Sequence, residues 1–307
     1  MSMRDVPISF PGLFGDWRFT VSGKLLDIGN GVYWYGVLIA AGLLLAIWLC
    51  SHLAPQYGFT GDDVLDVVLW AVPLGVIGAR LYYILFYLDL YRDESGALDF
   101  VKMVRIWDGG LAIYGGIILG FLTAALCCRR KKIPAPAFLD CVVMGVLVGQ
   151  IVGRWGNFMN REAYGAATDL PWRMRLWLSE TNYLDVHPTF LYESLWNLLG
   201  LALLVFVVSK HRRFDGQNLL FYFLWYGTGR FFIEGLRTDS LYLFNWTAFG
   251  HPIRVSQALS LLLALSAAIA LWYFLCVKRK TPDGLYVNRS TRIPQPSPAA
   301  DGSPQQS

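Results

Sequence analysis

The chain has 307 residues, of which 55% are hydrophobic and only 16% are charged, and its formal net charge is +4. Because soluble globular domains carry about 25% charged residues, this deficit indicates a membrane protein. The sequence contains no basic stretch interleaved with aromatic residues, so it does not indicate a nucleic-acid partner. The five cysteines lie in or beside apolar runs without CxxC or Cys/His spacing, which argues against a zinc site and a disulfide framework.

Several segments of the chain are long and apolar enough to cross a bilayer as a helix, which takes roughly 20 residues. They are residues 32–53, 64–88, 111–128, 135–156, 189–208, 217–235 and 255–277. The sixth is the least uniform, because Arg230 and Glu234 interrupt its apolar residues. The pattern predicts an all-α polytopic membrane protein with seven transmembrane helices.

Lysine and arginine indicate the orientation of the chain. The basic stretches RRKK (129–132), KHRR (210–213) and KRK (278–280) follow the third, fifth and seventh segments. With seven spans all of them lie on one side of the membrane, which the positive-inside rule identifies as the cytoplasm. We therefore expect the N-terminus outside and the C-terminus in the cytoplasm.

The remaining segments complete the expected domain organisation. Residues 1–280 form the membrane domain, and residues 157–188 within it are too long for a simple turn. We expect this segment to form a small external subdomain. Residues 281–307 are rich in proline, serine and glutamine, a composition that predicts a disordered cytoplasmic tail.

Most of the membrane segments carry polar side chains that this orientation places near the outer membrane face. They are Tyr35, Arg80, Asp108, Tyr114, Arg154, Asn157, Glu193, Arg230 and Glu234. A charge inside the apolar slab costs about 3 kcal/mol or more, so such groups pair with each other or face a water-filled cavity.

Two interpretations of these charges are open. Any single arginine fits a structural ion pair with Glu193 or Glu234. As a set, however, Arg80, Arg154 and Arg230 outnumber the two glutamates. Surplus positive charge in an outward-facing cavity indicates an anionic ligand, and the planar guanidinium group suits phosphate in particular.

The spacing of polar residues in the sixth segment is less specific. Tyr226, Arg230, Glu234 and Arg237 share one helical face. That arrangement also fits an amphipathic helix at the membrane interface. The sequence has no GxSxG, HExxH or P-loop motif and no aspartate cluster for magnesium, so we expect neither a metal nor a cofactor.

The segment GRWGNFMNREAYG, residues 153–165, resembles the signature of the prolipoprotein diacylglyceryl transferase family. Further blocks in the family's order are WYG (34–36), GARLYY (78–83), WDGGLAIYGG (107–116), HPTFLYES (187–194) and YGTGRFFIEGLR (226–237). The resemblance implies a multi-pass protein of the bacterial inner membrane whose active site faces the outer leaflet. It also implies transfer of the diacylglyceryl group of phosphatidylglycerol to the lipobox cysteine of a prolipoprotein signal peptide, with release of glycerol phosphate.

The membrane depth of the polar residues and the resemblance together predict roles for individual residues. Those expected to act in catalysis are Arg154, Arg230, Tyr114 and Glu162. Those expected to contact the substrate are Arg154, Asn157, Asn160, Gly165, Tyr35, Arg80, Tyr226, Glu193 and Glu234. Either Glu162 or Glu193 accepts the thiol proton or simply holds an arginine. Many family members have histidine where this chain has Tyr114, and a tyrosine there is expected to orient the lipid rather than to act as a base.

Other classes of function stay open. A lipid or organic-anion transporter would use the same arginines as a transit site, but transporters usually have internal repeats and spans broken near mid-membrane. The sequence contains no such repeat. A phosphatidyl-group enzyme that uses two metal ions would need the aspartate cluster that the sequence lacks. The expected partners are therefore phosphatidylglycerol, a prolipoprotein and membrane lipids, without nucleic acid.

Overall fold

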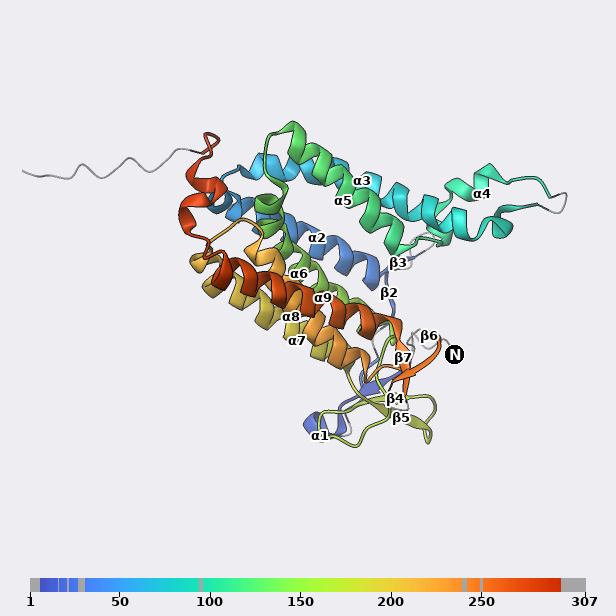
Figure 1. The fold of residues 1–307 in the computed structure, drawn as a ribbon. Coiled ribbons are helices and arrows are strands. Elements are labelled where there is room, and N and C mark those ends of the chain that lie inside the picture. Colours follow the sequence, from blue (N-terminus) through green and yellow to red (C-terminus); the bar gives the residue numbers. More distant parts are fainter. Residues whose placement is uncertain are drawn as a thin grey trace, which may run out of the picture. The chain divides into compact units, whose positions relative to one another are not determined.

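The computed structural model describes residues 6–15, 17–20, 22–26, 31–93, 96–238, 242–248 and 251–293 (Figure 1). These residues form long helices, joined by segments that contain short strands. The chain divides into two compact units. The first unit comprises Met1–Cys50 and Leu139–Pro282, and the second comprises Ser51–Phe138 and Asp283–Ser307.

The first unit is built mainly from long helices. They are α2 (Trp34–Leu53), α6 (Ala135–Asn160), α7 (Thr189–Leu203), α8 (Gln217–Glu234) and α9 (Val255–Trp272). The π-helical turns Leu204–Val208 and Tyr273–Val277 extend α7 and α9, and the turn η6 (Ser209–His211) follows the first of these. A short helix, α1 (Pro11–Phe14), lies near the start of the chain. In Figure 1, α8 lies alongside both α7 and α9, and it packs against each of them.

Short antiparallel strands lie between these helices. β1 (Ile8–Ser9), β4 (Met174–Trp177) and β5 (Tyr183–Val186) form a sheet in the order β1-β4-β5, while β2 (Lys24–Leu26) pairs with β3 (Val32–Tyr33) and β6 (Tyr242–Ala248) with β7 (His251–Arg254). Along β4, Met174 and Leu176 are buried, as the alternation of side chains in a strand requires. Between them, Arg175 binds Asp185 of β5 at 2.6 Å and lowers the pKa of that carboxyl group.

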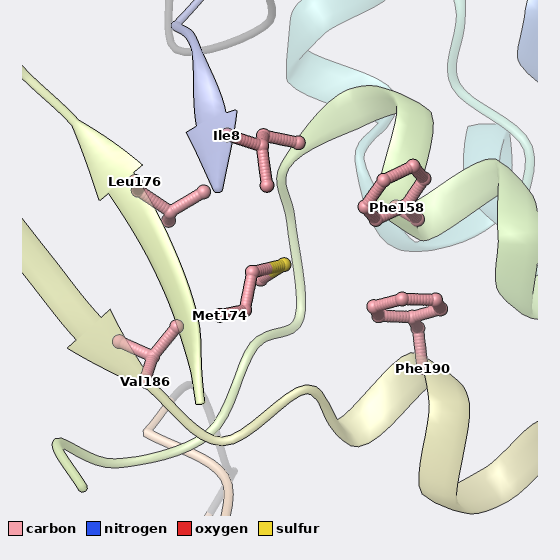
Figure 2. Close-up of a cluster of buried hydrophobic side chains, with 6 residues drawn as sticks. All are labelled: Ile8, Phe158, Met174, Leu176, Val186 and Phe190. Atoms are coloured by element: carbon pink, nitrogen blue, oxygen red, sulfur yellow. The ribbon is translucent and has the colours of Figure 1, made fainter. Parts of the chain in front are cut away.

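A buried hydrophobic cluster joins the sheet to the ends of α6 and α7 (Figure 2). Its members are Ile8, Phe158, Met174, Leu176, Val186 and Phe190. The rings of Phe158 and Phe190 face each other with centroids 4.6 Å apart. Because Phe158 directly follows Asn157 and Phe190 lies one helical turn before Glu193, the cluster fixes the helix ends that carry predicted site residues.

The second unit contains a closely packed helix pair. Its elements are η2 (Ala54–Tyr57), α3 (Gly61–Phe86), η3 (Leu88–Tyr91), α4 (Phe100–Val104), η4 (Ile106–Asp108) and α5 (Ile113–Arg130). α3 begins with a capping box, in which Thr60 and Asp63 each accept the other's backbone N–H, at 3.2 and 3.0 Å. Glycines bring α3 and α5 together, since a Cβ atom on Gly78 would lie 2.5 Å from the carbonyl oxygen of Gly115.

The segment after α9 differs from the predicted disordered tail. Residues 281–293 contain η8 (Pro282–Gly284) and η9 (Tyr286–Asn288), and Leu285 is buried. Ser290 Oγ donates to the carbonyl oxygen of Gly58, and Nη1 of Arg292 lies 2.9 Å from Oδ1 of Asp63. These contacts hold the segment on the second unit. Residues 294–307 of the predicted tail lie outside the described residues.

Each predicted membrane segment coincides with a long helix. Within the part of the chain that the structure describes, six helices are long and apolar enough to cross a membrane: Trp34–Tyr57, Gly61–Phe86, Ile113–Arg130, Ala135–Asn160, Thr189–His211 and Val255–Val277. The chain is therefore a multi-pass membrane protein. α8 falls short of this criterion because polar residues, including Arg230 and Glu234, interrupt it. The prediction of an all-α fold also missed the strands, which are too short to leave a clear alternating pattern.

Candidate active site

Helices α6, α7 and α8 bring basic and acidic side chains together. Glu193 of α7 binds two arginines: its Oε2 lies 2.6 Å from Nη2 of Arg154 on α6, and its Oε1 lies 2.8 Å from Nη1 of Arg230 on α8. Nη2 of Arg230 forms a second ion pair with Oε2 of Glu234, at 2.6 Å. We call Arg154 and Arg230 the arginine pair.

The carboxylates of this cluster are more deeply buried than the arginines. The exposed fraction of the side chain is 4% for Glu193 and 3% for Glu234, against 21% for Arg154 and 16% for Arg230. The acids therefore hold the arginine pair from within the protein. The two guanidinium groups remain partly exposed, so a ligand can reach them.

The arginine pair has hydrogen-bonding capacity beyond these contacts. A guanidinium group has five N–H donors. In the described part of the chain, the recorded acceptors of Arg154 are Glu193 and Oδ1 of Asn157, which lies 3.2 Å from Nη1. Those of Arg230 are Glu193 and Glu234. The Nε groups are not among the recorded donors, so both arginines can still bind phosphate oxygens.

Arg254, at the end of β7, adds a cation that was not predicted. Its Nη1 donates to the backbone oxygen of Glu234. Among the described residues, Arg154, Arg230 and Arg254 thus lie with Glu193 and Glu234, whereas the predicted surplus of positive charge had counted Arg80 in place of Arg254. The sequence signal was weak, because Arg254 directly precedes the last apolar segment instead of interrupting one.

The signature loop orients Asn157. Its Nδ2 donates to Oε1 of Glu162 at 2.9 Å, and Nδ2 of Asn160 donates to the same oxygen at 3.3 Å. With its amide nitrogen turned toward Glu162, Asn157 presents its oxygen to Arg154. Glu162 is exposed, and it reaches the arginine pair through this asparagine.

Gly165 has a packing role, and its predicted contact with the substrate stays a prediction. Its N–H donates to the carbonyl oxygen of His187 at 3.0 Å. A Cβ atom on Gly165 would lie 2.7 Å from Cβ of His187 and 3.0 Å from the carbonyl oxygen of Leu236. Only glycine at this position therefore lets the end of the segment 153–165 pass between the residues at the start of α7 and those just after α8.

Two predicted tyrosines lie on the helices next to the arginine pair. A Cβ atom on Gly156 of α6 would lie 2.6 Å from Cδ2 of Tyr35, so this ring covers the backbone two residues beyond Arg154. Tyr226 precedes Arg230 by one helical turn and stacks on Tyr222 with ring centroids 5.5 Å apart. Both tyrosines are partly exposed and stay candidates for substrate contact.

A pair of tryptophans sets α7 against α8, and the sequence analysis did not predict it. Trp196 and Trp225 stack with ring centroids 4.4 Å apart, and each indole N–H donates to the other's carbonyl oxygen, at 3.0 and 2.9 Å. Trp196 lies one turn after Glu193, and its ring occupies the space beside Gly229, the residue before Arg230. This tryptophan pair therefore sets the register of Glu193 against Arg230.

Replacing Gly229 with alanine is expected to destabilise the protein by about 1–3 kcal/mol, because the new methyl group overlaps the indole of Trp196. Activity should fall as well, since the shift moves Arg230 relative to Glu193. Gly149→Ala in α6 is the matched control, because a Cβ there meets nothing within 4 Å. Unfolding in mixed micelles measures the difference; equal stability of the two variants would contradict the role of the tryptophan pair.

Comparison with known proteins identifies the family. The model of the family described as prolipoprotein diacylglyceryl transferase matches residues 24–273. The chain belongs to this family. A Lactiplantibacillus plantarum protein named phosphatidylglycerol–prolipoprotein diacylglyceryl transferase is 44% identical over 252 residues, which cover 78% of this chain and 85% of that protein. A protein of the same name from Enterococcus faecalis is 42% identical over 269 residues, covering 85% of this chain and 91% of that protein. The family predicted from the sequence is confirmed.

In this member of the prolipoprotein diacylglyceryl transferase family, Arg80 does not have the predicted role. It belongs to the second unit and is 6% exposed. All five of its N–H groups donate to backbone oxygens, which are those of Met103, Gly109, Gly110, Lys102 and Arg105. The prediction that Arg80 binds substrate is therefore wrong, since no donor remains for a phosphate. The physical reason is that carbonyl groups at the end of a short helix lack helical partners.

Tyr114 also belongs to the second unit, where it lies in the first turn of α5. Its side chain is 57% exposed, and its ring centroid lies 6.3 Å from that of Tyr82. A role for Tyr114 in orienting the lipid stays a prediction. The side chain of Asp108 lies outside the described residues. Among the residues that the structure describes, no group of three or more His, Cys, Asp or Glu side chains could hold a metal ion.

Proposed function

We propose that this chain transfers the diacylglyceryl group of phosphatidylglycerol to the lipobox cysteine of a prolipoprotein and releases glycerol phosphate. Family membership and the names of the relatives support this activity, and they do not favour the transporter alternative. The observation that carries the chemistry is the binding of Arg154 and Arg230 to one buried carboxylate, Glu193. It sets two guanidinium groups side by side with donors still available.

The arginine pair binds the phosphate of the lipid. The thiolate of the acceptor cysteine attacks the glycerol carbon that carries the phosphate oxygen, and a C–S bond forms as the C–O bond breaks. The electron pair of that bond leaves with glycerol phosphate, so negative charge on the phosphate increases during the reaction. Fixed guanidinium groups stabilise such charge strongly in a site of low dielectric constant. The same positive potential favours the thiolate over the thiol.

Of the two carboxylates considered for the proton, Glu162 is the better candidate. Both oxygens of Glu193 are occupied by the arginine pair, and its side chain is 4% exposed. Glu162 is exposed, and the recorded contacts of its side chain, from Asn157 and Asn160, involve Oε1. In the described part of the chain no contact is recorded for its Oε2, which can accept the proton of the thiol. Glu193 instead holds the arginines in place.

Glu162→Gln should separate proton transfer from positioning. The glutamine keeps an oxygen that accepts from Asn157 and Asn160, but it cannot take a proton. We expect the transfer rate at neutral pH to fall by about 100-fold or more, and to recover partly near pH 8.5, where the thiol ionises by itself. The rate is measured across pH for Glu162→Gln and Glu162→Ala. Full activity of the glutamine variant would assign Glu162 to positioning alone.

We further propose seven membrane spans, with α8 as the sixth, in a bacterial inner membrane. α8 packs against both α7 and α9, so its polar residues need not face lipid. Counting α8 as a span also keeps the basic stretches 129–132, 210–213 and 278–280 on one side, as the positive-inside rule requires. The arginine pair then faces the outer leaflet. Labelling of single cysteines placed in these stretches and in residues 166–172, from each side of the membrane, tests the assignment.

The proposed activity is tested with purified protein, labelled phosphatidylglycerol and a lipobox peptide, with and without a chelator. We expect mass spectrometry to find a diacylglyceryl group on the peptide cysteine in both conditions. A peptide whose cysteine is replaced by serine is the control. Movement of lipid between leaflets without any adduct would support the transporter instead, and loss of the adduct with chelator would support a metal-dependent enzyme.

A further inference from the structure

The second unit contains a groove that the proposed reaction does not use. It has a volume of about 450 Å³ and lies between α3 and α5, at the end next to the basic stretch 129–132. Its walls are Asp66, Trp70, Leu74, Thr123, Leu126, Cys127, Arg130 and Lys131. On α3 the lining residues are spaced four apart, and on α5 they lie at positions 123, 126, 127 and 130, so each set occupies one helical face.

The packing of α3 on α5 explains where the groove lies. Toward the other end of these helices, glycines such as Gly78 and Gly115 allow the backbones to touch. This close approach continues to Gly120, whose Cβ would lie 3.6 Å from the carbonyl oxygen of Ala71. Beyond that point larger side chains separate the helices, and the groove opens between them. Its walls are largely apolar, and Trp70 on one wall is 61% exposed.

The mouth of the groove carries cations that are not neutralised by recorded contacts. Lys131 binds Asp66 at 2.5 Å and Asp63 at 2.9 Å, which raises the pKa of this lysine and occupies both acids. Its neighbours Arg129, Arg130 and Lys132 are exposed, and within the described residues no ion pair is recorded for any of them. An apolar groove thus ends at a positively charged rim.

We propose that this groove binds an anionic phospholipid of the cytoplasmic leaflet, with an acyl chain along Trp70 and the phosphate at Arg130. An amphiphile matches both parts of the site: a soluble anion would leave the apolar walls uncovered, and a neutral lipid would leave the cations unpaired. Basic pockets between membrane helices bind anionic headgroups in this way. In the proposed orientation the groove ends at the cytoplasmic stretch 129–132 and the arginine pair faces the outer leaflet, so this lipid is distinct from the substrate.

Quenching of Trp70 by brominated lipids tests the proposal. Delipidated protein in detergent is titrated with phosphatidylserine or phosphatidylcholine that carry the same brominated acyl chains, and the signal of Trp70→Phe is subtracted. Phosphatidylserine is anionic but lacks the glycerol headgroup of the proposed substrate. We expect half-maximal quenching of Trp70 at about fivefold less phosphatidylserine than phosphatidylcholine, or lower still.

Two charge-matched triple variants decide whether the rim causes this preference. Arg129→Gln, Arg130→Gln and Lys132→Gln together should abolish it. The control triple, Lys278→Gln, Arg279→Gln and Lys280→Gln, removes the same charge from the exposed stretch after α9 and should preserve it. Circular dichroism confirms that both variants are folded. Equal quenching of native Trp70 by the two lipids, or an equal loss of preference in both triples, would overturn the proposal.

Discussion

Replacing either Arg154 or Arg230 with lysine is expected to lower turnover by about 100-fold or more while the protein stays folded. In the structure each guanidinium group binds Glu193 and keeps further donors for a phosphate. A lysine ammonium is a compact charge on a flexible stem. It can pair with Glu193 or with the phosphate, but it cannot hold both in a fixed planar geometry.

The loss should appear mainly in kcat, because negative charge on the phosphate grows as the C–O bond breaks. Initial rates with labelled phosphatidylglycerol and a lipobox peptide give kcat and KM for each variant. Arg213→Lys is the control, since this arginine is exposed in the loop before α8. If both site variants kept the native rate, the arginine pair could not be the group that stabilises the leaving phosphate.

The sequence predicted the membrane helices well, because the apolar runs and the positions of lysine and arginine report directly on burial in lipid. Helix ends were less predictable. The apolar pattern ends at residue 156, whereas α6 continues to Asn160. The extra turn carries Asn157 and ends where Asn160 and Asn157 both bind Glu162. Hydrogen bonds among side chains, and not hydropathy, set this end.

For the site, membrane depth was a useful guide to which residues meet, but it could not define their partners. Arg80 and Arg230 interrupt similar apolar segments at the predicted outer face. Arg230 binds carboxylates, whereas Arg80 is used entirely by backbone oxygens of residues 102–110. That difference depends on how the connecting segment folds back on α3. No spacing rule within a single helix contains this information.

The tryptophan pair was missed for a related reason. Trp196 and Trp225 each look like ordinary apolar residues of a membrane helix. Their stacking depends on the rotation and register of α7 against α8, which hydropathy does not specify. The only local signals are Gly200 and Gly229, where any Cβ would overlap the facing indole. A glycine within an otherwise bulky membrane helix thus marked the place where a large ring from the neighbouring helix is buried.

Removing the carboxylate of Glu193 should affect stability as well as activity. Glu193→Ala leaves two partly buried arginines without their shared partner, and breaking a buried ion pair in this way costs about 3 kcal/mol or more. We expect the free energy of unfolding to fall by about 3 kcal/mol, at the lower end of the usual range, because Arg154 and Arg230 keep 21% and 16% exposure and can recruit water. Unfolding in mixed micelles measures this change.

Glu193→Gln separates the charge of Glu193 from its shape. The amide oxygen can still accept from one arginine, so stability should fall less than in Glu193→Ala. Turnover should fall in both variants, since the arginines are no longer held in register. Glu180→Gln is the control: its ion pair with Arg18 is on the surface, with the glutamate side chain 94% exposed, and its loss should change stability by about 0.5 kcal/mol or less. If the Glu193 variants were as stable and as active as this control, the buried carboxylate would have no part in placing the arginine pair.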